Sequence, residues 1–311
     1  MISCTEFIPA YSELFTFLAD TYGRGEVARL WDYLFQPDGK GIPLVNFVKE
    51  HGIRGCWEYW SGTLTEEACD CTMYLNEKAG WFLIKMHRCP SKGRLLDLEK
   101  SAGIRPYPEY CLHCDHYRSA VESVGLKYLY NFTGTERACC SMLIYDPGVF
   151  DGRVIADENT QKREIRSADL EYFHPDFHSS LNMGIEYLGS RHGEKAVEQY
   201  LQQYSRRVYA KLIESIRAEG LPALMAHLEN TYEAEHAPDA LSMRLEGNAL
   251  FVDIHYCPGV RHLQKTGRQV SRWYPWTTKT VMETIAKAAG LKFEMAEYSE
   301  ETGACAYSFR A

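Results

Sequence analysis

The chain lacks the features that most readily assign a sequence to a class. No stretch approaches the ~18–20 consecutive apolar residues of a membrane-spanning helix, so no membrane segment is expected. The first residues have neither the basic start nor the apolar core of a signal peptide, which predicts a cytoplasmic protein. With a net charge of −8 and only short basic clusters, the chain also lacks the surface that nucleic-acid binding requires.

Cysteine, in contrast, is plentiful. The 311 residues include eleven cysteines. Without an export signal, disulfides are not expected, because the cytoplasm keeps thiols reduced. An odd number with close pairs is typical of free thiols, a metal site or a catalytic sulfur. The close pairs are Cys69/Cys71, Cys111/Cys114 and Cys139/Cys140.

A short motif occurs twice at a long interval. His-Arg-Cys-Pro at residues 87–90 recurs as His-Tyr-Cys-Pro at residues 255–258, an offset of 168 (255 − 87). Gly-Leu-Lys at residues 125–127 recurs at residues 290–292, an offset of 165 (290 − 125). Cys140 recurs as Cys305 at the same offset of 165. Two nearly constant offsets indicate a tandem duplication.

Hydrophobic periodicity predicts the same order of elements in both halves. In the first half we expect helices near 14–22, 27–34 and 43–50, strands 72–76 and 81–87, helices near 94–102 and 109–124, and strands 127–132 and 137–145. In the second half we expect helices 181–188 and 194–218, strands 242–245 and 249–256, a helix 277–289, and strands 291–298 and 304–309.

The predicted fold class is therefore α+β. Each pair of hairpins makes a four-stranded antiparallel sheet with one apolar face, which the helices must cover. We expect two tandem copies of a helices–ββ–α–ββ unit, at residues 1–150 and 169–311. Residues 151–168 are rich in charge and poor in apolar periodicity, so we interpret them as the linker.

Comparing the copies separates shared residues from unique ones. Four reactive residues of the first half have no reactive counterpart in the second. With their counterparts at the offset of 165, they are Cys111/Trp276, His113/Thr278, Cys114/Lys279 and Cys139/Ala304. Residues that both copies keep can serve the fold, whereas chemistry in one copy is a candidate for function. We therefore expect the functional site in the first half.

Hydrolysis by a cysteine nucleophile is one chemistry that this set suits. Such a site needs a base beside the thiol and donors for an oxyanion. The candidate nucleophiles are Cys140 and Cys139 on a predicted strand. The candidate bases are His87 and His113, with Asp115 as a group that orients or assists the base. The first N–H groups of the helix near Tyr110 could bind a carboxylate or the oxyanion.

A metal site is the alternative use of the same residues. Zn²⁺ prefers four nitrogen or sulfur ligands, and Cys-x-x-Cys presents two thiolates together. The candidate ligands are Cys111, Cys114, His87 and Cys89, although a second Cys-x-x-Cys is missing. A further set, His174, Asp176 and His178, would form a metal-binding face only if it were helical, and Pro175 opposes a helix there. Zinc is thus the one cofactor considered.

Structural roles compete with these functional ones. Cys140 and Cys305, retained at equivalent strand positions, are expected to pack in a core, because cysteine behaves as a small hydrophobic residue. The shared His87 and His255 are expected to make a local hydrogen bond that fixes the turn. Five other residues are candidates for lining a ligand pocket as well as for packing. They are Trp57, Trp60, Tyr110, Arg272 and Trp276.

The element order, with Gly-Ala-Cys-Ala-Tyr-Ser-Phe at residues 303–309, resembles the four-vinyl-reductase domain and the small TRAPP subunits that share its fold. Thr-Gly-Thr at 133–135 followed by Cys139-Cys140 resembles the L-2-amino-thiazoline-4-carboxylic acid hydrolase family. The latter resemblance implies a hydrolase of a small heterocyclic C=N or amide-like bond. The former implies a non-catalytic sensor that binds a small molecule, a tetrapyrrole or a metal. Either would have a small-molecule partner and no nucleic acid or membrane, and a homodimer stays open.

Overall fold

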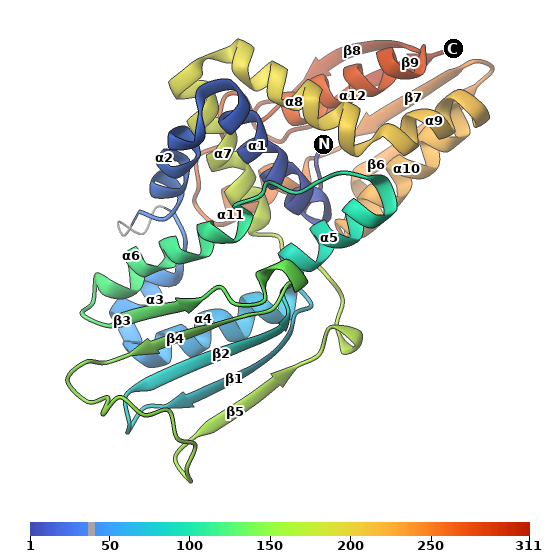
Figure 1. The fold of residues 1–311 in the computed structure, drawn as a ribbon. Coiled ribbons are helices and arrows are strands. Elements are labelled where there is room, and N and C mark those ends of the chain that lie inside the picture. Colours follow the sequence, from blue (N-terminus) through green and yellow to red (C-terminus); the bar gives the residue numbers. More distant parts are fainter. Residues whose placement is uncertain (37–40) are drawn as a thin grey trace. The chain divides into compact units, whose positions relative to one another are not determined.

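The computed structural model describes residues 1–36 and 41–311, and the chain divides into two compact units (Figure 1). The middle unit is Tyr22–His174, and the terminal unit joins Met1–Thr21 to Pro175–Ala311. Each contains an antiparallel sheet with helices, which confirms the α+β class. Among the described residues, no helix has the length and apolar character needed to cross a membrane.

The middle unit begins with three helices and continues into its sheet. The elements are α2 (Arg24–Leu34), α3 (Leu44–His51), α4 (Ile53–Glu66), β1 (Asp70–Asn76), β2 (Trp81–Arg88), α5 (Pro90–Ala102), the 3₁₀ helix η2 (Tyr110–His116), α6 (Tyr117–Glu122), β3 (Lys127–Asn131), η3 (Thr135–Arg137), β4 (Cys140–Tyr145), β5 (Gln161–Ile165) and η4 (Ser167–Asp169). The order across the sheet is β3-β4-β2-β1-β5.

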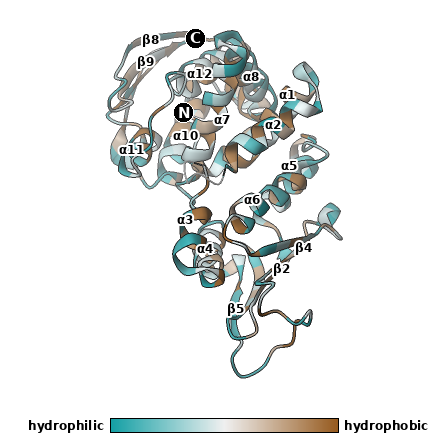
Figure 2. Ribbon diagram, turned by 90° about the vertical axis from the view of Figure 1, so that its left-hand side faces the viewer, coloured by the Kyte–Doolittle hydropathy of each residue, from teal (hydrophilic) through white to brown (hydrophobic). Residues whose placement is uncertain are grey.

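The core of the middle unit lies on one face of this sheet. Cys71, Met73 and Leu75 alternate along β1 and are buried, because successive strand residues point to opposite faces. Trp60 of α4 stacks on Phe82 of β2, with 5.9 Å between ring centroids. Hydrophobic and hydrophilic residues alternate along α2 and α5, as expected for helices with one face on a core (Figure 2).

The terminal unit repeats this arrangement. Its elements are η1 (Cys4–Glu6), α1 (Phe7–Tyr22), α7 (Phe177–His192), α8 (Glu194–Val208), α9 (Ala210–Glu219), α10 (Leu221–Ala234), η5 (Pro238–Ala240), β6 (Leu241–Glu246), β7 (Ala249–Ile254), α11 (Pro258–Lys265), α12 (Trp276–Ala289), β8 (Lys292–Tyr298) and β9 (Cys305–Arg310). Its sheet has the order β6-β7-β9-β8, which matches β1-β2-β4-β3 of the middle unit.

Finer details also match between the copies. Met86 pairs with Cys140 across β2 and β4, and Ile254 pairs with Cys305 across β7 and β9. The helices α4 and α10 are each followed by a glutamate and then by a residue of positive φ, Ala68 in one copy and His236 in the other. Strand order, register and backbone geometry therefore all support the duplication.

The division into units differs from the predicted boundaries at both ends of the first copy. Helix α1 lies within the predicted first copy but belongs to the terminal unit. There the Tyr200 hydroxyl of α8 donates to the Ala10 carbonyl at 2.8 Å, and Leu14 lies against Gly184 of α7. Within the stretch interpreted as the linker, β5 pairs with β1 and adds a fifth strand to the predicted four.

The repeated His-x-Cys-Pro motif forms the same turn in each copy. Pro90 and Pro258 are the first residues of α5 and α11, where proline's fixed φ suits a helix start. Nε2 of His87 lies 2.7 Å from the Thr72 hydroxyl, and Nε2 of His255 lies 2.7 Å from the Ser242 hydroxyl. The expected local hydrogen bond is thus present in both copies.

Candidate functional site

Four cysteines gather at one end of the sheet of the middle unit. We call Cys89, Cys111, Cys114 and Cys140 the thiol cluster. Cys89 caps α5 directly after β2, and Cys140 opens β4, which pairs with β2. The 3₁₀ helix η2 brings the other two, and the Tyr128 hydroxyl fixes it by donating to the Cys114 carbonyl at 2.8 Å. Antiparallel pairing and one hydrogen bond therefore assemble residues from three elements.

The thiols of this cluster remain protonated near neutral pH. Burial raises the pKa of Cys89 to about 12, and that of Cys111 and Cys140 to about 11. Burial also raises the pKa of Cys114 well above its usual value, and the neighbouring thiols raise it further. Because a thiolate is the reactive form, a nucleophile from this cluster needs a general base beside it.

His113 is placed to be that base. Its Nδ1–H donates to the Tyr110 carbonyl, which assigns the tautomer and leaves the lone pair on Nε2. Nε2 lies 3.5 Å from Sγ of Cys114. Burial lowers the pKa of His113 to about 4, against the opposing Tyr110 bond, so the ring is neutral. A neutral imidazole nitrogen facing a thiol can accept its proton.

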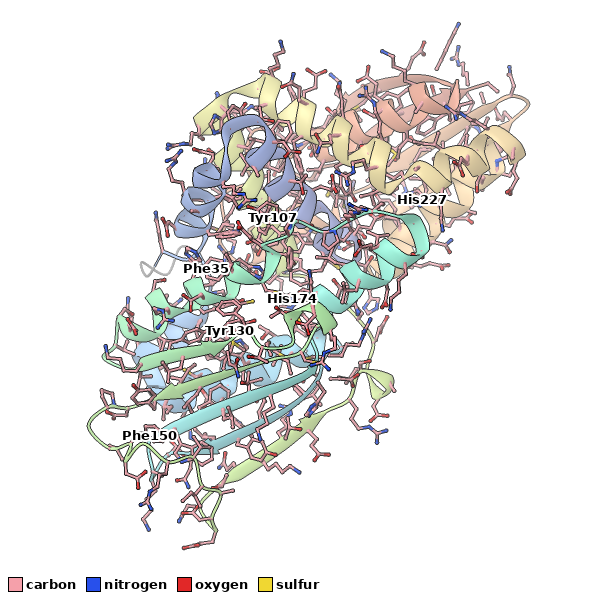
Figure 3. All side chains as sticks on the ribbon, in the orientation of Figure 1. Phe35, Tyr107, Tyr130, Phe150, His174 and His227 are labelled. Atoms are coloured by element: carbon pink, nitrogen blue, oxygen red, sulfur yellow. The ribbon has the colours of Figure 1, made fainter. Side chains whose placement is uncertain are left out.

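Tyr130 lies on β3 (Figure 3). Its hydroxyl lies close enough to the Cys140 and Cys114 thiols to lower the pKa of each, against the larger effect of burial. Burial raises the pKa of Tyr130, so the hydroxyl keeps its proton. The N–H of Tyr110, in contrast, already donates to the Tyr107 carbonyl at 3.1 Å. The Tyr130 hydroxyl is therefore a protonated group beside these thiols.

Lys92 adds a positive charge beside the cluster. It lies in the first turn of α5, is only 9% exposed, and opposes the effect of burial on the Cys111 pKa. Among the described residues, no carboxylate lies within ion-pair distance of its ammonium group. The counterpart at the offset of 168 is Val260, which is fully buried. A buried ammonium group without an acidic partner is suited to binding an anion.

The structure separates the predicted catalytic residues. Because its ring bonds Thr72, His87 makes only a backbone contact with Cys139, whose thiol donates to the His87 carbonyl at 3.0 Å. Asp115 pairs with Arg118 at 2.6 Å. In the described part of the chain, neither predicted nucleophile lies in a hydrogen bond to a histidine ring, and the Cys139 thiol donates to a backbone carbonyl. The pair that forms is Cys114 with His113.

The predicted zinc ligands are also incompletely assembled. His87 points to Thr72 rather than to Cys89, Cys111 and Cys114. In residues 1–36 and 41–311, the one group of three close ligand atoms lies in the terminal unit, at Cys4, His178 and Glu235. His174 bonds Glu66 of the middle unit, so it is not a ligand partner of His178.

Most of the predicted pocket residues pack instead. Trp57 and Trp60 both contact the Phe82 ring in the core, and Tyr110 is buried. In the terminal unit, Arg272 lies over the Trp273 ring at 4.2 Å, and Trp276 is the first residue of α12. A groove of about 320 Å³ does open in the middle unit, apart from the thiol cluster. Its lining residues are Asp70, Cys71, Thr72, His87, Arg88, Glu164, Ile165 and Arg166.

Comparison with protein-family models, curated proteins and solved structures found no match. The site is therefore interpreted from its own geometry. Sequence reasoning did not select Lys92 or Tyr130, although a comparison of the two copies could have identified both. Their counterparts in the second copy are Val260 and Met295, so the same comparison that selected Cys111 and Cys114 also distinguishes these two.

Proposed function

We propose that the chain is a hydrolase that opens a small heterocycle at a C=N or amide-like carbon, with Cys114 as the nucleophile and His113 as the general base. The contact between Nε2 of neutral His113 and Sγ of Cys114, at 3.5 Å, carries this proposal. The resemblance of the Thr-x-Thr and Cys-Cys pattern to the aminothiazoline carboxylate hydrolases supports the substrate class. Free thiols throughout the chain support a cytoplasmic location.

The first step forms a bond between Sγ of Cys114 and the amidine-like carbon. The thiol proton passes to Nε2 of His113 as the C=N double bond becomes a C–N single bond. The Tyr130 hydroxyl donates to the group on which negative charge develops. His113 then delivers the proton to this nitrogen. The other nitrogen on the same carbon forms a C=N bond as the ring C–N bond breaks, and its proton passes through His113 to the leaving nitrogen.

The second step releases the enzyme. Water attacks the carbon that is bound to sulfur, and His113 accepts a proton from that water. His113 passes this proton to the C=N nitrogen. The C–S bond to Cys114 then breaks as a C=O bond forms on the same carbon, and the hydroxyl proton returns to the thiol. The net reaction adds one water molecule to the substrate and opens the ring, without an oxidant or a reductant. Lys92 holds a carboxylate of the substrate during both steps, because it is a buried cation that needs an anion.

The test measures the turnover of 2-amino-thiazoline-4-carboxylate and related cyclic amidines through the loss of the absorbance of the ring. The wild type should open at least one of them. We expect Cys114→Ala to lower kcat by roughly a thousandfold or more, because the covalent step is lost. The matched control is Cys305→Ala, which removes a buried thiol from the other copy and should keep kcat. A folded Cys114→Ala enzyme with wild-type turnover would refute the assignment, and a wild type that binds these rings without opening them would favour a sensor.

A further inference from the structure

A second group of reactive side chains belongs to the terminal unit, whereas the thiol cluster belongs to the middle unit. Cys4 comes from η1, His178 from the first turn of α7, and Glu235 follows the last residue of α10. One ligand atom from each lies within 4.8 Å of the other two. All three residues are buried, with exposed fractions of 1% for Cys4, 1% for His178 and 5% for Glu235.

The orientation of the group is fixed from several sides. Oε1 of Glu235 accepts from the Cys4 backbone N–H at 2.5 Å, and Oε2 lies 3.0 Å from Nε2 of His178. Nδ1 of His178 lies 3.0 Å from the hydroxyl of buried Tyr274. A histidine that binds a metal through one nitrogen is commonly held by a hydrogen bond to the other. Tyr274 is placed to be this partner.

The backbone is shaped around these groups. A Cβ atom on Gly259 would lie 2.1 Å from the Tyr274 hydroxyl and 2.8 Å from Nδ1 of His178. In the first copy the equivalent residue is Ser91, at the offset of 168. The counterpart of His178 is Ile8, at the offset of 170 between the starts of α1 and α7. The histidine and the glycine are therefore not shared by the two copies, whereas a glutamate follows α4 and α10 alike.

The chemistry of the group suits a metal ion. Burying a carboxylate costs free energy unless the carboxylate is paired. The thiol, the imidazole and the carboxylate lie at one point and share few protons among them. Thiolate, imidazole and carboxylate are the three kinds of side chain that bind Zn²⁺.

We propose that Cys4, His178 and Glu235 bind one Zn²⁺ ion in the terminal unit. Sγ, Nε2 and one carboxylate oxygen are the ligands, and a water molecule completes the tetrahedron. The ion takes the place of the direct bond between His178 and Glu235. It ties together three segments that are remote in sequence, and it is independent of the proposed hydrolysis.

The experiment uses full-length protein carrying Cys111→Ser and Cys114→Ser, so that the thiol cluster does not contribute. This protein is treated with a chelator and then titrated with Co²⁺. Co²⁺ binds at zinc sites and, when a thiolate is a ligand, gives a charge-transfer band in the near ultraviolet. We expect one equivalent to bind with this band, and Zn²⁺ to displace it. Adding Cys4→Ser should remove the band, and adding Tyr274→Phe should weaken Co²⁺ binding by roughly tenfold or more.

Two results would overturn the site. One is a folded parent protein that gives no thiolate–Co²⁺ band, which needs no further variant to interpret. The other is a band that survives Cys4→Ser unchanged, because the thiolate would then belong to another cysteine. Circular dichroism of each variant shows whether a lost band reflects a lost ligand or a lost fold.

Discussion

The chemistry of His113 depends on the two groups that its ring nitrogens contact. The Tyr110 carbonyl accepts a hydrogen bond from Nδ1–H, and the Cys114 thiol faces Nε2, which carries the lone pair. Sequence neighbours rarely meet in this way along a strand, where successive side chains diverge. In the 3₁₀ helix η2 the two side chains lie close enough to interact.

The pH dependence of turnover should report this environment. Burial lowers the pKa of His113 from 6.5 to about 4, so the base is already neutral at pH 5. We expect kcat/KM to fall in acid with an apparent pKa near 4 rather than near 6.5. An acid limb centred near 6.5 would mean that His113 is more solvated than the structure shows, or that another histidine is the base.

The same shift affects stability. Since the folded-state pKa of His113 lies below the unfolded value, the unfolded chain binds the proton more readily. This contribution to stability is fully present above pH 6.5 and is lost as the pH falls toward 4, by up to about 3 kcal/mol. Urea unfolding between pH 7 and pH 4 measures it. The His113→Gln variant should lose this part of the dependence, and an unchanged profile would contradict the shift.

Lys92 gives a test of substrate binding with a natural control. Lys92→Val introduces the residue that the second copy buries at the equivalent position, so the fold should tolerate it. We expect KM for a carboxylate-bearing ring to rise by roughly ten- to a hundredfold, the value of a hydrogen bond to a charged group. KM for the same ring without its carboxylate should barely change. Equal changes for both substrates would place Lys92 outside the binding site.

Among the elements, the His-x-Cys-Pro turn shows why a repeated motif is a poor guide to catalysis. In each copy the histidine bonds a hydroxyl on the neighbouring strand, and the cysteine and proline start a helix. The motif is retained because it joins a strand to a helix. The copies differ in the element that comes after this helix. It is the 3₁₀ helix η2 after α5 in the middle unit and the start of α12 after α11 in the terminal unit.

This structural role predicts matched effects in the two halves. Thr72→Ala and Ser242→Ala each remove the partner of a histidine ring, and each should lower the free energy of unfolding by about 1 kcal/mol. Neither should change kcat. Denaturant unfolding and turnover measure the two quantities. If Thr72→Ala abolished turnover while the protein stayed folded, His87 would regain a role in the chemistry.

The sequence predicted some elements and missed others for physical reasons. The hairpins were predicted, because alternating burial and tight turns are local signals. Helices α4 and α10 were missed, because glycine, aromatic and β-branched residues in α4 and a proline in α10 weaken helix propensity, and packing stabilises both. The sequence of β5 is typical of a linker, because Ile165 is the one apolar residue among its five. It forms by pairing with β1, a contact that no local pattern encodes.

The candidate site was predicted in its location but not in its pairing. Comparison of the copies selected the half, and it selected Cys111, His113 and Cys114. The expected partner of Cys140 was a histidine, whereas the sheet register and η2 bring Tyr130 to it. Which side chains meet across β3, β4 and η2 depends on tertiary packing rather than on spacing in the sequence.

For the whole molecule, the units of folding are not the units of duplication. Helix α1 packs on α7 and α8, so residues 1–150 contain a helix without its partners. We expect the fragment 22–174 to unfold in one cooperative transition. We expect the fragment 1–150 to aggregate, because Phe15 and Leu18 would be exposed and β5 would be lost. Thermal unfolding by circular dichroism distinguishes them, and equal stability of the two fragments would contradict this division.

Attack of Cys114 on the substrate forms a covalent intermediate, and detecting that intermediate is the sharpest test of the proposed hydrolysis. A single turnover of a ring that the enzyme opens can be quenched in acid, and the protein digested and mapped by mass spectrometry. We expect the mass of the opened ring on the peptide that contains Cys114, and its absence from Cys114→Ala. An adduct on Cys139 or Cys140, or turnover without any adduct on Cys114, would contradict it.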